Sequence, residues 1–173
     1  MATFTKIASV TVGSGGAASM SFSSIPSTYT DLCIKISART TDASNYQSIY
    51  MTVNGGAQGS VLSQKWVNGN GTAVASGGYS SIGQIYPFYI PGSSATANTF
   101  GNGEVYITNY ASATIFKSMS ADGTTENNAT DARIEFGAIS FASNTAITSL
   151  LFAPGAGNFV QYSTAVLYGI KNS

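Results

Sequence analysis

The stretch FSSIPSTYTDLCIKISART, residues 22–40, contains the pattern that decides the fold. Pro26 fixes a backbone angle, and the Ser and Thr residues around it favour a turn. After this turn, apolar and polar side chains alternate, with Leu32, Ile34 and Ile36 sharing one face. A period of two is typical of a strand that buries one face, so the stretch predicts a turn followed by a half-buried β-strand.

The same alternation recurs along most of the chain, whereas helical periodicity is almost missing from the sequence. Clusters of Gly, Asn, Asp and Ser separate the alternating segments, as expected for turns. The candidate strands lie at residues 3–12, 17–23, 31–39, 47–54, 60–67, 79–90, 103–110, 114–121, 131–142, 147–153 and 163–171. This spacing predicts an all-β fold, an antiparallel, jelly-roll-like β-sandwich forming one domain over residues 1–173. Residues 1–16 are expected to form an N-terminal strand that could act as an arm contacting a neighbour.

Proline and glycine modify this pattern at four places. Pro87 interrupts the run IYPFYIP, so this strand is expected to be an edge strand or to carry a bulge. Residues 68–81 are rich in Gly, Ser and Asn, which predicts a long hairpin connection. The glycine-rich segments at 13–16 and 101–103 lack the following helix of a phosphate-binding loop, so both are predicted to be turns.

Charge is scarce and balanced, which limits the possible partners. Only 8% of the 173 residues are charged, with seven basic and seven acidic side chains. The basic residues are scattered, whereas phosphate binding needs them clustered, so no nucleic-acid partner is predicted. The N-terminal segment lacks the apolar stretch of a secretory signal, and the uncharged region 66–103 is too polar for a membrane span. We therefore expect synthesis in the cytoplasm without a signal peptide, and no membrane partner.

Residues capable of catalysis are equally scarce. The sequence has no histidine, which excludes Ser-His-Asp and Cys-His mechanisms as well as His-based metal sites. The single cysteine, Cys33, is expected to be a small buried side chain. Asp131 and Glu135 flank Arg133 on one strand face, and surface charge pairing is their expected role. The sequence predicts no catalytic residue, no metal site and no cofactor, and thus a protein that is not an enzyme.

Two basic residues of the opening stretch share a face of one candidate strand. Lys35 and Arg39 lie four positions apart, which places both on the same side of an extended chain. They are too few for a ligand patch, so we expect ordinary charges on the solvent face.

The aromatic side chains are the remaining candidates for a functional surface. Tyrosine and tryptophan offer large, rigid contact areas with polar tips, which suit sugars or a protein partner. The alternative is that these side chains simply belong to the core, and the sequence leaves both open. The candidate interface residues are Trp66, Tyr79, Tyr86, Phe88, Tyr89, Tyr106 and Tyr110.

Three segments indicate self-association. The candidate strands at 103–110 and 163–171 are apolar on both faces, so their second faces are either buried or in contact with a partner. The run 79–91 is a neutral, aromatic edge without the charges that normally protect edges. An oligomer is therefore expected.

Three motifs resemble a family of small virion proteins of tailed bacteriophages, notably those of marine bacteria and cyanobacteria. The family pattern has a turn IPxTYTDL, a central NYxxxTxxKS and a C-terminal LYGIK. These correspond here to residues 25–32, 109–118 and 167–171, and the resemblance runs from about residue 20 to the end. It implies a β-sandwich on the virion surface, in which a homotrimer is the expected oligomer.

The resemblance implies two alternative roles, neither of them enzymatic. The first is a capsid decoration or cement protein on the head, with the major capsid protein as its partner. The second is the tip domain of a tail fibre or spike, which binds a receptor or a host-surface glycan. A polysaccharide depolymerase is a third possibility that no motif in the sequence supports.

Overall fold

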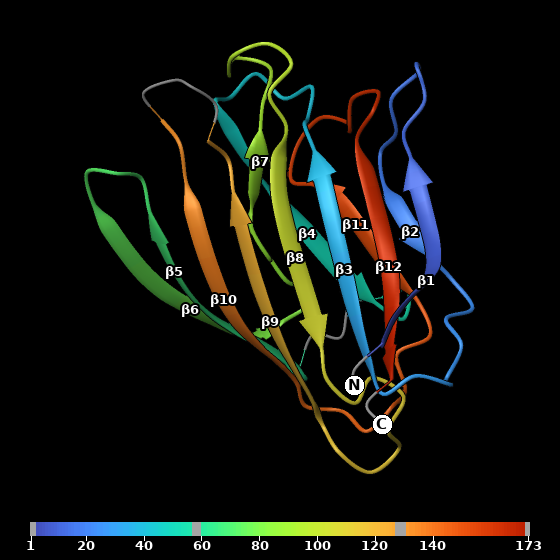
Figure 1. Ribbon diagram of the computed structural model, residues 1–173. Helices are drawn as coiled ribbons and strands as arrows, with labels where there is room; N and C mark the ends of the chain where they lie inside the picture. Colours follow the sequence, from blue (N-terminus) through green and yellow to red (C-terminus); the bar gives the residue numbers. More distant parts are fainter. Residues whose placement is uncertain (1–2, 57–59, 127–130, 172–173) are drawn as a thin grey trace.

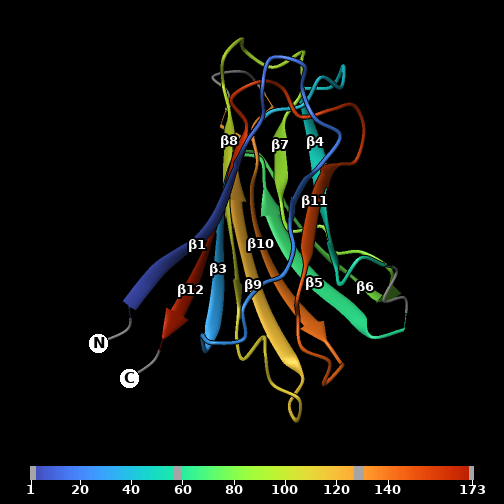
Figure 2. The same ribbon diagram turned by 90° about the vertical axis from the view of Figure 1, so that its right-hand side faces the viewer.

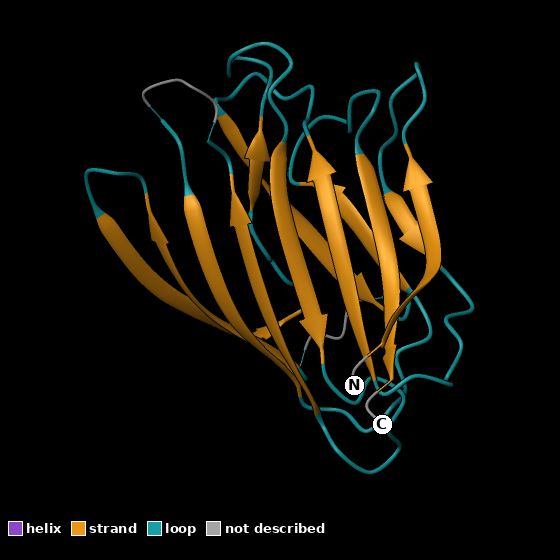
Figure 3. Cartoon of the chain, in the orientation of Figure 1, coloured by secondary structure: helices purple, strands orange, loops and turns teal. Residues whose placement is uncertain are grey.

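The computed structural model describes residues 3–56, 60–126 and 131–171, and within these residues every regular element is a β-strand (Figures 1 and 3). The strands are β1 (Thr3–Thr11), β2 (Met20–Phe22), β3 (Asp31–Ala38), β4 (Tyr46–Val53), β5 (Leu62–Gly69), β6 (Val74–Ile82), β7 (Tyr89–Pro91), β8 (Gly101–Ile107), β9 (Lys117–Thr124), β10 (Ile134–Phe141), β11 (Leu150–Pro154) and β12 (Thr164–Lys171). Within this described part there is no helix long and apolar enough to cross a membrane.

The strands form two antiparallel sheets, which confirms the expected β-sandwich. The large sheet has eight strands in the order β1-β12-β3-β8-β9-β10-β5-β6, and the small sheet has four in the order β2-β11-β4-β7. β1 pairs with β12 along its length and forms one edge of the large sheet, so the predicted N-terminal strand is in place. The opposite edge is β6.

The core lies between the small sheet and one half of the large sheet. Ile34 of β3 and Leu167 of β12 face Met51 of β4 and Phe152 of β11, and all four are fully buried. Figure 1 shows the small sheet behind β1, β12, β3 and β8, while β10, β5 and β6 extend beyond it. In the turned view of Figure 2, β5 and β6 curve towards the side on which the small sheet lies. This curvature creates a concave inner surface next to the sandwich.

The turn and the strand of the opening stretch form as predicted. The turn leads into β3, which is central in the large sheet and buries Leu32, Ile34 and Ile36 on the inner face. Asp31, at the start of β3, is also buried and accepts hydrogen bonds from the Asn109 amide and the Tyr106 hydroxyl, both at 2.8 Å. Because these bonds cross from β3 to the end of β8, the turn residue also fixes the neighbouring strand.

Arg39 is not the solvent-face charge that its position in the sequence suggests. It is 8% exposed, and its guanidinium donates to backbone carbonyl oxygens of the segment 93–99. The distances are 2.7 Å to Thr96 O, 2.9 Å to Ala95 O and 3.1 Å to Thr99 O. Three carbonyl groups of this loop thus converge on one buried cation, and Thr96 O also accepts from the amide and hydroxyl of Thr99. Lys35 is a surface charge as expected and pairs with Glu104.

The glycines at 101–103 belong to β8 and not to a turn. A Cβ atom on Gly101 would lie 2.8 Å from Pro91 Cδ, and one on Gly103 would overlap the ring of Phe88. These glycines are therefore required by close packing of the small sheet on the large one. The predicted turn at 13–16 is present, with Gly16 at a φ of 70°.

The predicted long connection at 68–81 is in fact mostly strand. β5 continues to Gly69, β6 starts at Val74, and a short turn joins them. Asn70 Oδ1 accepts hydrogen bonds from the amides of Thr72 and Ala73, and Gly71 takes a φ of 88°. The polar sequence of β6 resembles a loop because its side chains lie on an exposed edge strand.

The run expected as one strand at 79–90 is divided between the two sheets. Its first part belongs to β6, its last part belongs to β7, and Pro87 lies in the segment between them. Each of these strands forms an edge of its sheet. The predicted single strand through Pro87 is therefore wrong: the proline lies where the chain crosses from one sheet to the other, between two edge strands.

A candidate aromatic pocket

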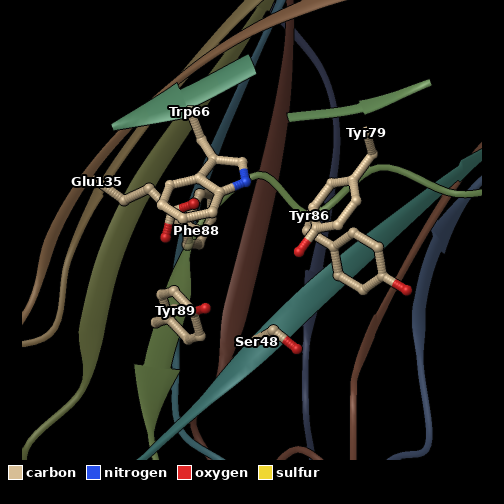
Figure 4. Close-up of a pocket in the computed structure, with 7 residues that line it drawn as sticks. All are labelled: Ser48, Trp66, Tyr79, Tyr86, Phe88, Tyr89 and Glu135. Atoms are coloured by element: carbon tan, nitrogen blue, oxygen red, sulfur yellow. The ribbon is translucent and has the colours of Figure 1, made fainter. Parts of the chain in front are cut away.

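A cavity of about 270 Å³ opens on the concave inner surface, where β5, β6 and β10 extend past the small sheet. Five of the seven aromatic residues singled out from the sequence meet here, contributed by β5, β6, β7 and the segment that leads into β7 (Figure 4). The residues that line the pocket are Ser48, Trp66, Tyr79, Tyr86, Phe88, Tyr89 and Glu135.

Trp66 forms one wall. It lies on the inner face of β5, where its register partners are Gly137 on β10 and Gly77 on β6. Because both neighbours lack a side chain, the indole ring has room to lie along the sheet. A Cβ atom on Gly77 would approach Trp66 Cζ2 to 2.6 Å, so the ring lies directly over that strand.

Tyr79 and Tyr86 form the opposite wall. Their ring centres are 5.8 Å apart with an interplanar angle of 52°, and Figure 4 shows both rings facing the hollow from the same side. The backbone of Tyr86 is fixed by the buried side chain of Gln64, whose Oε1 accepts from the Tyr86 amide at 2.9 Å while its Nε2 donates to Tyr86 O. The Tyr86 hydroxyl accepts a hydrogen bond from Gln84 Nε2 at 2.8 Å. This wall is therefore preformed.

Phe88 and Tyr89 form the floor. Phe88 is 1% exposed, and it occupies the space left by Gly103 and Gly123 on the large sheet. Tyr89 pairs with Ser48 between β7 and β4. The Tyr89 ring meets that of Tyr46 edge to face, with centroids 5.2 Å apart. Burial is the main cause that raises the pKa of the Tyr89 hydroxyl, so it stays protonated near neutral pH.

Glu135 contributes the one carboxyl group among the described residues that line the pocket. It is 5% exposed, and within the described chain its Oε2 is buried without a hydrogen-bond partner. Burial raises the pKa of the carboxyl to about 7, against a smaller lowering by the charge of Arg133. Figure 4 shows the carboxylate beside the Trp66 ring and the floor of the pocket. A buried acceptor of this kind favours a ligand that brings a donor.

The expected surface pairing of Glu135 with Arg133 is wrong, because Glu135 is buried and its Oε2 has no hydrogen-bond partner within the described chain. The guanidinium carbon of Arg133 lies 4.1 Å from the centre of the Tyr46 ring and 5.0 Å from that of Tyr89, and the guanidinium donates to the Tyr46 hydroxyl. Glu135 faces inward because β10 places its odd-numbered residues on the inner face, as the buried Phe141 shows. The Arg133 side chain is therefore held by aromatic rings next to the pocket.

Tyr106 and Tyr110 lie outside the pocket. Tyr110 is 1% exposed and its hydroxyl donates to Pro26 O, so it belongs to the core. Tyr106 lies on the outer face of β8 and its hydroxyl donates to Asp31. Burial, followed by this hydrogen bond, raises the Tyr106 pKa to about 12.

Metal and thiol chemistry find no support elsewhere in the described residues. They contain no group of three or more His, Cys, Asp or Glu residues that could hold a metal ion. Cys33 is buried as predicted, and burial is the main cause that raises its pKa to about 12. A thiol of this kind is unreactive at neutral pH.

Sequence reasoning missed Glu135 and Ser48, although a signal for Glu135 exists. Ile139 and Phe141 are strongly apolar and must face the core, and counting back in steps of two from them reaches residue 135. The same count places Ile134 and Phe136 on the outer face. If the face of β10 were assigned from its apolar residues alone, these two side chains would be placed in the core instead. A charged residue on the inner face is the kind of local conflict that marks functional sites.

In comparisons with known proteins, no family model matches this chain, and no curated protein matches it either.

Proposed function

We propose that this protein is a non-enzymatic surface protein of a bacteriophage virion that binds host-surface glycan in the aromatic pocket. The observation that carries the proposal is the meeting of Trp66, Tyr79, Tyr86 and Tyr89 with the Glu135 carboxyl around one cavity. The flat apolar faces of sugar rings stack on aromatic side chains, and their hydroxyl groups bond to polar groups at the ring edges. A fibre tip or spike is the matching location on the virion.

The size of the pocket indicates how much ligand it holds. Its volume of about 270 Å³ is just below the range of roughly 300–1,000 Å³ that is typical of sites for whole small molecules. It therefore suits one terminal sugar unit, with the rest of the glycan chain extending over the exposed strand β6. In a homotrimer, three such pockets would bind a glycan-covered surface together, and the avidity would exceed that of a single site.

Binding without cleavage fits the chemistry of the lining. Glycoside hydrolysis generally uses two carboxyl groups about 5–9.5 Å apart. Among the described residues that line the cavity, Glu135 alone carries a carboxyl, and the other polar groups are tyrosine, tryptophan and serine side chains. These groups recognise a ligand and supply no acid–base pair.

A glycan array tests the proposal. Labelled wild-type protein is expected to bind a defined subset of host-surface glycans, and Trp66→Ala and Tyr79→Ala are expected to lose that binding. Phe4→Ala is the control, because Phe4 is 55% exposed on β1, at the opposite edge of the same sheet. Binding that survives both pocket substitutions, or no binding to any host glycan, would refute the proposed function.

A second candidate function is head decoration, with the major capsid protein as partner, and one feature favours it. The outer face of β10, β5 and β6 carries an exposed apolar strip made of Val67, Val74, Ile134 and Phe136. Exposed apolar residues gathered on one face are typical of interaction surfaces. Antibody labelling of intact virions separates the two functions, because decoration predicts signal over the whole head and glycan binding predicts signal at the tail.

A further inference from the structure

The pocket combines two features that favour the same kind of ligand group. Its walls are the electron-rich faces of Trp66, Tyr79 and Tyr86. Beside them lies the 95%-buried carboxyl of Glu135, whose Oε2 has no hydrogen-bond partner within the described chain. Aromatic faces attract cations through their quadrupole, and a buried carboxylate is strongly destabilised unless it is paired.

We propose that the group seated in the pocket is an organic ammonium, the protonated amine of an amino sugar, with the Glu135 carboxylate as its counter-ion and the aromatic rings around it. This inference rests on the proposed glycan-binding function and names the class of sugar. The ammonium N–H groups donate to Glu135 Oε2, and the apolar face of the sugar ring stacks on Trp66. A neutral sugar would gain only the stacking and one uncharged hydrogen bond.

The other groups around Glu135 leave this carboxylate open to a ligand cation. Among the described residues, Arg133, just before β10, is the one charged neighbour that affects the Glu135 carboxyl, and its guanidinium is held by Tyr46 and Tyr89. The register partners of Glu135 are Gly123 on β9 and Asn68 on β5, both uncharged. Tyrosine hydroxyls from β6 and from the segment before β7 complete the surroundings.

The Arg133 side chain itself shows that this region accommodates a cation among aromatic rings. Its guanidinium carbon is 4.1 Å from the centre of the Tyr46 ring, which is within the range for cation–π contacts. The proposed ligand would repeat this arrangement beside Glu135, two residues further along the chain, with the Glu135 carboxylate as hydrogen-bond acceptor in place of the Tyr46 hydroxyl.

The decisive probes are two trisaccharides that differ in charge, the β-1,4-linked glucosamine trimer and its fully N-acetylated form. Trp66 is the only tryptophan in the sequence and lines the pocket, so its fluorescence reports binding directly. The wild type is expected to bind the amino form at least about tenfold more tightly than the acetylated form. Glu135→Gln, which keeps the shape and removes the charge, is expected to abolish that difference.

A ligand whose charge does not change with pH tests the effect of Glu135 protonation on binding. Choline keeps its charge at every pH, so its affinity follows the ionised fraction of the carboxyl, whose pKa is about 7 in the free protein. The dissociation constant measured by calorimetry is therefore expected to be roughly a hundredfold weaker at pH 5 than at pH 8 or above. In Glu135→Gln the affinity for choline is expected to be weak and independent of pH.

A second variant protects the test against misfolding of Glu135→Gln. Tyr79 is 46% exposed, so Tyr79→Leu keeps the fold, removes one aromatic face and is expected to weaken binding of the amino trimer severalfold. Equal or tighter binding of the acetylated trimer would overturn the inference and leave the glycan-binding function standing. If neither trimer binds, the inference also fails, and the glycan array decides separately whether the proposed function fails with it.

Discussion

The indole ring of Trp66 lies directly over Gly77, its register partner on the neighbouring strand β6. An added Cβ atom at Gly77 would lie 2.6 Å from Trp66 Cζ2 and 3.0 Å from Cε2. No real Cβ atom approaches another group so closely, so the ring can keep its position only while residue 77 has no side chain. The wall of the pocket thus depends on a glycine of an exposed edge strand.

Gly77→Ala is therefore expected to displace the Trp66 ring and to weaken ligand binding by roughly tenfold, or about 1.4 kcal/mol. The fluorescence maximum of Trp66 should shift, while the midpoint of urea unfolding should change little, because β6 is an edge strand. The matched control is Gly137→Ala, where the added Cβ atom makes an ordinary contact at 3.6 Å with Gln64 Nε2. Unchanged fluorescence and binding in Gly77→Ala would contradict the described position of the ring.

Gly123→Ala is expected to destabilise the whole sandwich, because the added Cβ atom would overlap Cβ of Phe88. That atom is part of the rigid start of the side chain and cannot rotate away. Overpacking of this kind typically costs about 1–3 kcal/mol of the free energy of unfolding, measured by urea denaturation. Gly15→Ala serves as control, since a Cβ atom there meets nothing within 4 Å. Equal effects of the two substitutions would show that Phe88 does not pack on β9.

Replacement of Arg39 by Ala is expected to lower the free energy of unfolding by about 1–3 kcal/mol, because it removes the donor to the buried carbonyl of Ala95 and one donor each from Thr96 O and Thr99 O. Hydrogen exchange should increase in that segment. Lys35→Ala, four residues earlier, is the matched comparison. It breaks only the exposed ion pair with Glu104, whose side chains are 56% and 31% exposed for Lys35 and Glu104. Such surface pairs contribute less than about 1 kcal/mol. Similar losses of stability for both variants would contradict the hydrogen bonds described between the Arg39 guanidinium and the segment 93–99.

Glu135 is expected to make stability fall as the pH rises. Its pKa is about 7 in the folded protein and 4.5 in the reference state, so the folded protein binds more protons between these values. Below pH 4.5 the carboxyl is protonated in both the folded and the unfolded state, so it does not lower the free energy of unfolding. As the pH rises through 4.5 to 7, the free energy of unfolding decreases, by up to about 3 kcal/mol in total. The measurement is urea unfolding of the wild type and Glu135→Gln at pH 5 and pH 8.

The difference between these two proteins isolates the contribution of Glu135. Asp122 also has a pKa raised mainly by burial, and its contribution has the same sign, but it is present in both proteins and cancels. Stability curves that run parallel from pH 5 to pH 8 would show that the carboxyl is not desolvated.

The all-β fold could be predicted from the sequence because the alternation of apolar and polar residues depends only on residues close together in the chain. β3 illustrates this, since Leu32, Ile34 and Ile36 specify the buried face without reference to any other strand. Strand pairing and the division into eight and four strands were not readable, because they depend on contacts between segments far apart in the chain. The glycines of β8 show the limit clearly, because only the approach of Phe88 explains why Gly103 is a strand residue.

Only part of the pocket could be predicted from the sequence. The aromatic residues between 66 and 89 could be selected because they gather in a region without charge. Their convergence with Glu135 could not, since it requires the curvature of the large sheet and the crossing of the chain from β6 to β7. Arg39 was assigned to the surface for a similar reason, because its acceptors lie more than fifty residues away in sequence.

The side chains that form the pocket walls are separate from those that hold the sandwich together. Trp66, Tyr79, Tyr86 and Tyr89 line the cavity, whereas the core cluster is built from other residues and shares only Phe88 with the pocket. Substitutions at the walls can therefore change what is bound while the scaffold remains intact. A binding surface that varies independently of its scaffold allows new specificities to arise by single substitutions, without an intermediate that fails to fold.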